Sequence, residues 1–283
     1  MVDTSYQKPV FESGKLTGFE TASKVATVVT EADADTGWSD GWYVVNGVVN
    51  LPSRITVTGE VHLILTDGCN LTANGGINVN SSLTIYGQQN GTGTLTAKGG
   101  STQAGIGGND NETSGTITIN GGDITARGGD NGAGIGGGGK LGYGDGGNIT
   151  INGGSVIANS DMYGGNGASI GGGRGANGGN IIITGGYVTA NGWGIGAGGE
   201  GYSGGSFSTG VNGNAFITAE RISDKSNQNN WSGVIFVGDE GKVYGSPELK
   251  EDATIPNGKT LTIENDKTLT IPSGVTLTNN GKV

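Results

Sequence analysis

The side chains that could do chemistry in this chain of 283 residues are a few carboxylates and a single histidine. Glycoside hydrolases need two carboxylates across a cleft, one of them kept protonated by its surroundings. The candidate carboxylates here are Asp110, Glu112, Asp130, Asp145 and Asp161. Their glycine-rich neighbours would leave them solvated, without the surroundings that such a pair needs. The only histidine, His62, lies in a strand-like pattern without a nucleophile elbow or a Ser-His-Asp set. We therefore predict no catalytic residue and no enzyme activity.

Oxygen-rich loops are a second chemical feature. Residues 109–112 read Asn-Asp-Asn-Glu, and Asp145 lies in GYGDGG; calcium accepts such ligands. A calcium-binding β-helix repeats its G-G-x-G-x-D spacing in successive coils, and this chain has one fragment of it, GYGD. Asp and Asn also stabilise ordinary turns. We therefore predict no metal site and no cofactor, with calcium as the one alternative left open.

Exposed aromatic residues next to polar ones are a stronger functional signal, because together they suit the apolar faces and hydroxyl edges of sugar rings. Tyr163 and Trp193 fall in equivalent loops of consecutive repeats, which places them about 4.8 Å apart if the loops align. Asp130, Asp161 and Asn166 lie in loops at the same edge. We predict that these five residues bind a glycan. The alternative is that each ring only shields glycine-rich backbone from water.

The element that must position these loops is a repeat. Equivalent apolar residues lie at Leu83, Ile117, Ile149 and Ile181, so that successive copies are 34, 32 and 32 residues apart. A fixed period in this range is typical of stacked-repeat proteins, in which one copy cannot bury its own apolar face.

Within each copy the apolar period is two, as in a β-strand. Ile117 and Ile119 alternate with threonines, a Gly-Gly corner follows at residues 121–122, and a second short strand contains Ile124 and Ala126. A third inward position is an isoleucine between glycines, at Ile106, Ile135, Ile170 and Ile195. The pattern predicts an all-β, right-handed parallel β-helix with glycine-rich coils of about 32 residues and three short strands each.

The domain organisation follows from where this pattern begins and weakens. Residues 1–43 are acidic and weakly patterned, which favours an N-terminal cap or linker. Residues 44–222 are predicted to be the β-helix. Residues 223–283 are predicted to continue the solenoid or to begin a next module, with strand positions at Ile263, Ile271 and Leu277. Because the pattern stops abruptly, we expect a monomeric fragment of a longer chain.

Charge and composition exclude several partner classes. The formal net charge is −10, which argues against nucleic acid or anionic membrane as a partner. No apolar run is long enough to insert into a membrane. The single cysteine, Cys69, follows the inward register and is predicted to be a buried, inert thiol.

The run from Ile55 to Ala97, followed by AGIGG and ITINGG recurring together in order, resembles the glycine-rich β-helical repeat regions of large secreted and wall-anchored proteins of Firmicutes. These regions are often labelled carbohydrate-binding. The resemblance covers roughly residues 40–220 and implies an extracellular location, at the surface or cell wall of a Gram-positive bacterium.

These observations favour a secreted or cell-surface module that binds a polysaccharide or host glycan in adhesion. One alternative is a passive stalk that spaces another domain from the wall. A second alternative is a polysaccharide lyase or hydrolase, because parallel β-helices often carry such enzymes.

Overall fold

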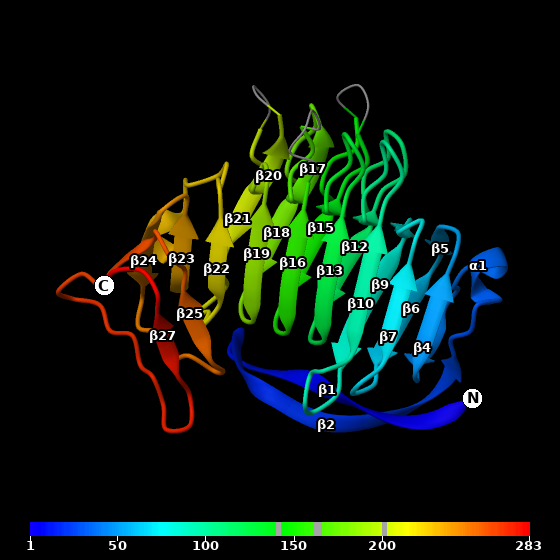
Figure 1. Cartoon of the computed structure of the whole chain (residues 1–283), viewed down its shortest axis with the longest axis horizontal. Coiled ribbons are helices and arrows are strands. Elements are labelled where there is room, and N and C mark those ends of the chain that lie inside the picture. Colours follow the sequence, from blue (N-terminus) through cyan, green and yellow to red (C-terminus); the bar gives the residue numbers. More distant parts are fainter. Residues whose placement is uncertain (140–142, 161–165, 200–202) are drawn as a thin grey trace.

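The structure is a computed structural model that describes residues 1–139, 143–160, 166–199 and 203–283. These residues form a right-handed parallel β-helix in which successive coils stack along one axis and each coil adds strands to three sheets (Figure 1). The predicted fold class is confirmed. Helical structure in the described residues is confined to α1 (Asp33–Thr36) and the 3-10 turn η1 (Gln228–Asn230).

The strands fall into three large sheets and one small sheet. The first sheet runs in the order β1 (Val2–Glu12), β2 (Lys15–Val28), β3 (Gly41–Val45), β6 (Glu60–Leu65), β9 (Ser82–Gly87), β12 (Thr116–Ile119), β15 (Asn148–Ile151), β18 (Asn180–Ile183) and β21 (Ser206–Ser208). The second contains β4 (Val48–Leu51), β7 (Asn70–Ala73), β10 (Thr94–Lys98), β13 (Asp123–Arg127), β16 (Ser155–Asn159), β19 (Tyr187–Asn191), β22 (Phe216–Ala219), β23 (Gly233–Val237), β24 (Glu240–Tyr244) and β26 (Thr260–Thr262). The third contains β5 (Ile55–Val57), β8 (Ile77–Val79), β11 (Ile106–Gly107), β14 (Ile135–Gly136), β17 (Ile170–Arg174) and β20 (Ile195–Gly198), and the small sheet pairs β25 (Ala253–Ile255) with β27 (Leu277–Asn279).

The predicted isoleucine columns form the core. Ile119, Ile151 and Ile183 pair in register in the first sheet and have no exposed surface. The neighbouring Thr118 and Thr150 face outward and stay partly exposed. In the third sheet the predicted column is also in register, at Ile106, Ile135, Ile170 and Ile195. Full burial of each such side chain is worth about 1.5–3 kcal/mol, so the columns hold the coils together.

The coils are not of equal length. Val61 pairs with Leu83, 22 residues further along the chain, whereas Leu83 pairs with Ile117, 34 residues further along. The period of about 32 residues therefore applies to the central coils only. In the coil from Leu83 to Ile117, the additional residues include the loops that rise above β10 and β12 in Figure 1.

The Gly-Gly corner after the first strand of each central coil needs its glycines. Gly154 has φ +86°, in the left-handed region, and an added Cβ would lie 2.5 Å from the carbonyl oxygen of Gly122 in the preceding coil. The residue before the corner is polar and buried: the amide of Asn152 donates to the side-chain oxygen of Asn120 at 2.8 Å. A hydrogen-bonded side-chain ladder thus runs between coils beside the corner.

Residues 1–28 form an antiparallel hairpin of β1 and β2, which we call the strap. Its end pairs in parallel with β3, so it continues the first sheet beyond the first coil. In Figure 1 the strap runs beneath the solenoid instead of staying at the first coil. Phe19 lies against Gly153, and Leu16 lies against Gly185. The strap therefore covers several coils, whereas the sequence favoured an N-terminal cap or linker.

The C-terminal residues form a second, smaller core. β23 is parallel to β22, β24 turns back antiparallel, and the β25–β27 pair packs beside them. Leu277 lies in β27 as predicted. The predicted strand positions Ile263 and Ile271 were wrong, because β26 ends at Thr262 and these side chains are 39% and 45% exposed.

Candidate functional site

The loops predicted to bind a glycan do begin at one edge of the solenoid. The strands before them end in register, with Arg127 paired to Asn159 and Asn159 paired to Asn191. Asp130 is exposed and accepts a hydrogen bond of 2.8 Å from the hydroxyl of Ser101 in the preceding coil. Asn166 is half-buried. Asp161 and Tyr163 lie outside the described residues, so the five-residue site stays a prediction.

Trp193 is held by contacts within the chain. The guanidinium carbon of Arg221 lies 5.3 Å from the centroid of its ring, a cation–π arrangement. Its backbone N–H donates to the hydroxyl of Ser160 at 3.0 Å, and the residue is half-buried. A sugar could therefore not stack on the face of this ring that Arg221 covers.

The oxygen-rich loop at residues 109–112 contacts a cation from the chain itself. The Nε of Arg54 donates to Asn109 Oδ1 at 2.7 Å, and Nη2 donates to the carbonyl oxygens of Gly107 and Gly108 at 3.0 and 3.1 Å. Burial lowers the pKa of Arg54 to about 10, so the guanidinium remains charged at neutral pH. Among the described residues, no three His, Cys, Asp or Glu side chains lie close enough to hold a metal ion.

His62 is packed as an aromatic residue. Its ring stacks on Trp42 with centroids 4.2 Å apart, and Nδ1 lies 3.3 Å from the hydroxyl of Tyr86. Burial lowers the pKa of His62, and the carboxylate of Glu60, 3.4 Å from Nε2, partly raises it again. Cys69 is 2% exposed, and burial raises the pKa of its thiol. The burial of Cys69 confirms the prediction of a buried thiol.

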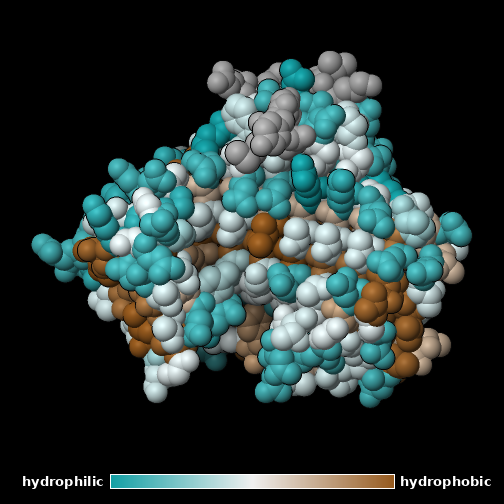
Figure 2. Space-filling model, in the orientation of Figure 1, coloured by the Kyte–Doolittle hydropathy of each residue, from teal (hydrophilic) through white to brown (hydrophobic). Residues whose placement is uncertain are grey.

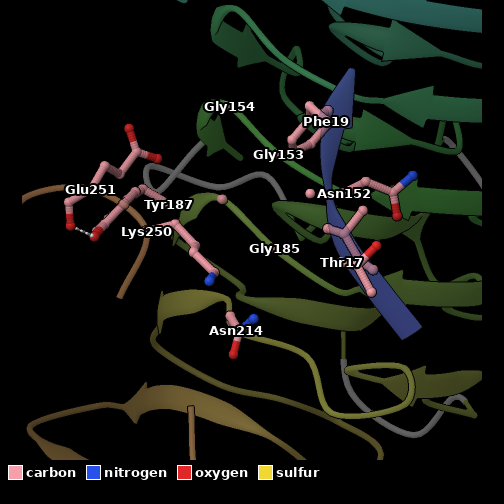
Figure 3. Close-up of a pocket in the computed structure, with 13 residues that line it drawn as sticks. Thr17, Phe19, Asn152, Gly153, Gly154, Gly185, Tyr187, Asn214, Lys250 and Glu251 are labelled. Atoms are coloured by element: carbon pink, nitrogen blue, oxygen red, sulfur yellow. Dashed lines mark hydrogen bonds between the residues drawn. The ribbon is translucent and has the colours of Figure 1, made fainter. Parts of the chain in front are cut away.

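One cleft in the described part of the chain lies where the strap crosses the Gly-Gly corners. We call it the strap cleft; its volume is about 220 Å³. Figure 3 shows Thr17 and Phe19 projecting from the strap on one side, with Asn152 beside the strap, and Tyr187, Lys250 and Glu251 on the other side, with Asn214 near Lys250. Phe19 is 39% exposed. Two aromatic rings thus flank amide and charged groups.

A second cleft lies on the other side of Tyr187. This sheet cleft, of about 410 Å³, separates the outer face of β16, β19 and β22 from the C-terminal residues 251–256. Hydroxyl groups of Ser155, Thr189 and Thr218 line one wall, and Figure 2 shows the surface hollowed where the C-terminal strands meet the second sheet. The volume is in the range of small-molecule sites.

Tyr187 joins the two clefts. Its hydroxyl donates to the backbone oxygen of Glu251 at 2.5 Å, and its ring stacks on Phe216 with centroids 5.5 Å apart. Burial, followed by the charges of Glu251 and Asp252, raises the pKa of the phenol well above its usual value. The ring is therefore fixed in one orientation, as a preorganised binding platform should be.

Carboxylates dominate the charge of the sheet cleft. Burial raises the pKa of Glu251, and repulsion from Asp252 raises it further, although the side chain keeps contact with solvent. Asp252 accepts a hydrogen bond of 2.7 Å from the backbone N–H of Thr276. Lys250 lines only the strap cleft, and its ammonium lies 2.8 Å from the carboxylate of Glu248.

Sequence reasoning missed these clefts, although one signal was present. Asp123, Ser155 and Tyr187 occupy one outward column of the second sheet, so an aromatic residue replaces small polar ones directly after a Gly-Gly corner. Phe19 and Glu251 gave no such signal, because they come from segments outside the repeats.

Comparison with known proteins agrees with the fold. A family model described as a beta helix repeat matches residues 90–110, 117–139 and 149–174. The chain contains a parallel β-helix repeat region. The matched segments begin in the loop after β9, end with β17, and include Asp130 and Asn166. No curated protein and no solved structure gives a significant match, and none of the described helices has the length and apolar character to cross a bilayer.

Proposed function

We propose that this chain is a carbohydrate-binding module of a secreted or wall-anchored surface protein of a Gram-positive bacterium, serving in adhesion to a polysaccharide or host glycan. The observation that carries the proposal is the pair of clefts on either side of Tyr187. An aromatic platform lies there among hydroxyl, amide and carboxylate groups, the combination that sugar rings need. Binding without catalysis, metal or cofactor is part of the proposal.

Three observations support the location. The ring of Tyr187 is held by Phe216 and by the carbonyl of Glu251, so little side-chain entropy is lost when a ligand stacks on it. The sheet cleft is lined by the outer face of β16, β19 and β22, which belong to a sheet of ten stacked strands along which a linear polymer can extend beyond one sugar unit. The strap and the C-terminal residues form the walls, which gives both segments outside the repeats a role in binding.

Retention on insoluble polysaccharides and in glycan-containing native gels tests the proposal. Tyr187→Ala should reduce retention, since an aromatic contact is worth about 0.5–1.5 kcal/mol beyond the area it buries. The matched control is Tyr143→Ala, because Tyr143 is 69% exposed and lies in a distant loop. Circular dichroism and the melting temperature of each variant show whether the fold is kept.

A third variant, Trp193→Ala, separates the two candidate positions. Loss of retention in Tyr187→Ala alone supports the clefts, and loss in Trp193→Ala alone supports the loop edge. Retention of no polysaccharide by the folded wild-type chain would contradict binding and leave a passive stalk as the better interpretation. New reducing ends or unsaturated uronate released from any retained polymer would contradict the absence of catalysis.

A further inference from the structure

The sheet cleft has an unbalanced negative charge. Glu251 and Asp252 both line it, and none of the described residues that line it is a lysine or an arginine. Two carboxylates beside one cleft repel an acidic ligand and attract a cationic one. Glu251 has no ion-pair partner among the described residues, so its charge is available to a ligand.

The rest of the cleft favours a ligand that also has an apolar face and several hydroxyl groups. The half-buried ring of Tyr187 offers one face for stacking, and an aromatic face also attracts a cation. Thr189 and Thr218 are paired in register on adjacent strands, so their hydroxyls recur at the strand spacing of about 4.8 Å. An alkylammonium without hydroxyls would leave these groups unused.

We propose that the sheet cleft recognises amino sugars with a free ammonium group, as found in glucosamine-rich polysaccharides, in preference to neutral or uronic-acid polymers. The inference rests on the proposed function and names the class of glycan. Glu251 and Asp252 would bind the ammonium, Tyr187 would stack on the sugar ring, and the threonines would contact its hydroxyls.

The charge of the whole chain acts in the same direction and must be controlled for. A formal net charge of −10 attracts any polycation at low salt, whether or not a specific site exists. A site at the cleft predicts that one carboxylate there matters more than an equivalent carboxylate elsewhere. Asp35 is the matched reference, because it is exposed and lies on α1, at the opposite end of the solenoid (Figure 1).

The experiment is calorimetric titration of the full chain with four tetrasaccharides: β-1,4-linked glucosamine, its N-acetylated form, cellotetraose and tetragalacturonate. The pH is about 6, where an amine of ordinary α-amino basicity is protonated. We expect the glucosamine tetramer to bind most tightly. Glu251→Gln should weaken its binding about two- to fivefold, the range for a partly exposed ion pair, and Asp35→Asn should leave it unchanged.

The outcomes separate the two proposals. Equal affinity for the glucosamine and neutral tetramers, unchanged in Glu251→Gln, would overturn the selectivity and keep carbohydrate binding. Equal weakening by Glu251→Gln and Asp35→Asn would show that the attraction is general and would also overturn it. Binding of none of the four, nor of any polysaccharide in the retention assay, would remove the proposed function itself.

Discussion

The hydrogen bonds of Arg54 give the most direct test of how the loops of different coils are held. Its guanidinium donates to the carbonyl oxygens of Gly75 and Ala104, both at 2.8 Å, in addition to its bonds with the loop at residues 107–109. Among the described residues, these two carbonyls accept no other hydrogen bond. One side chain therefore connects loops that are up to 55 residues apart in the chain.

Removing this side chain leaves the carbonyl oxygens of Gly75 and Ala104 without a hydrogen-bond donor. Leaving a buried acceptor without a partner costs about 1–3 kcal/mol, so two of them amount to roughly 2–6 kcal/mol. Water reaching the partly exposed site reduces the loss, and we expect Arg54→Met to lower the free energy of unfolding by about 3 kcal/mol. The methionine keeps the apolar stem, so the loss reports the hydrogen bonds. Arg54→Lys keeps the charge but not the planar fork, and should be intermediate.

Guanidinium chloride unfolding followed by far-ultraviolet circular dichroism measures the effect, with linear extrapolation of the free energy. Coincidence of this transition with the one seen by tryptophan fluorescence checks two-state behaviour, which repeat proteins do not always show. Arg174→Met is the control, because Arg174 is exposed and should change stability by less than about 0.5 kcal/mol. A change of that small size in Arg54→Met would refute the argument.

Three further predictions concern the core, a glycine and pH. Ile151→Asp should prevent folding because it places a charge between two coils, while Thr150→Asp in the same strand should still fold. A soluble Ile151→Asp variant that melts cooperatively would contradict the inward position of Ile151. Gly136→Ala should lower the melting temperature far more than Gly18→Ala, because the added Cβ would lie 2.0 Å from a backbone oxygen of the next coil, whereas Gly18 has open space. The pKa of His62 is lowered in the native state, so the unfolded chain binds a proton at this residue more readily. The free energy of unfolding should therefore fall as the pH decreases below 6.5. Denaturation curves measured across that pH range should lack this component in His62→Gln.

The sequence alone determined the solenoid. The local patterns are an apolar period of two in each strand, corners of paired glycines, and isoleucines about 32 residues apart. In a stacked-repeat fold such a local pattern also specifies which residues are neighbours in space. The repeat spacing was therefore enough to place Ile151 between Ile119 and Ile183. The inward position of Cys69 followed from the same register.

Only the tertiary structure decided the contacts that do not join equivalent positions of two repeats. Tyr187 and Glu251 are 64 residues apart, and Arg54 and Asn109 are 55 apart; neither contact joins equivalent positions of two repeats. The strap meets the solenoid through Phe19, in a segment with no repeat pattern of its own. Such contacts depend on loop lengths and on how the end segments fold back, because side-chain packing there is set by shape and not by periodicity. The candidate clefts form at these contacts, so the repeat pattern could predict the scaffold but not the position of the site.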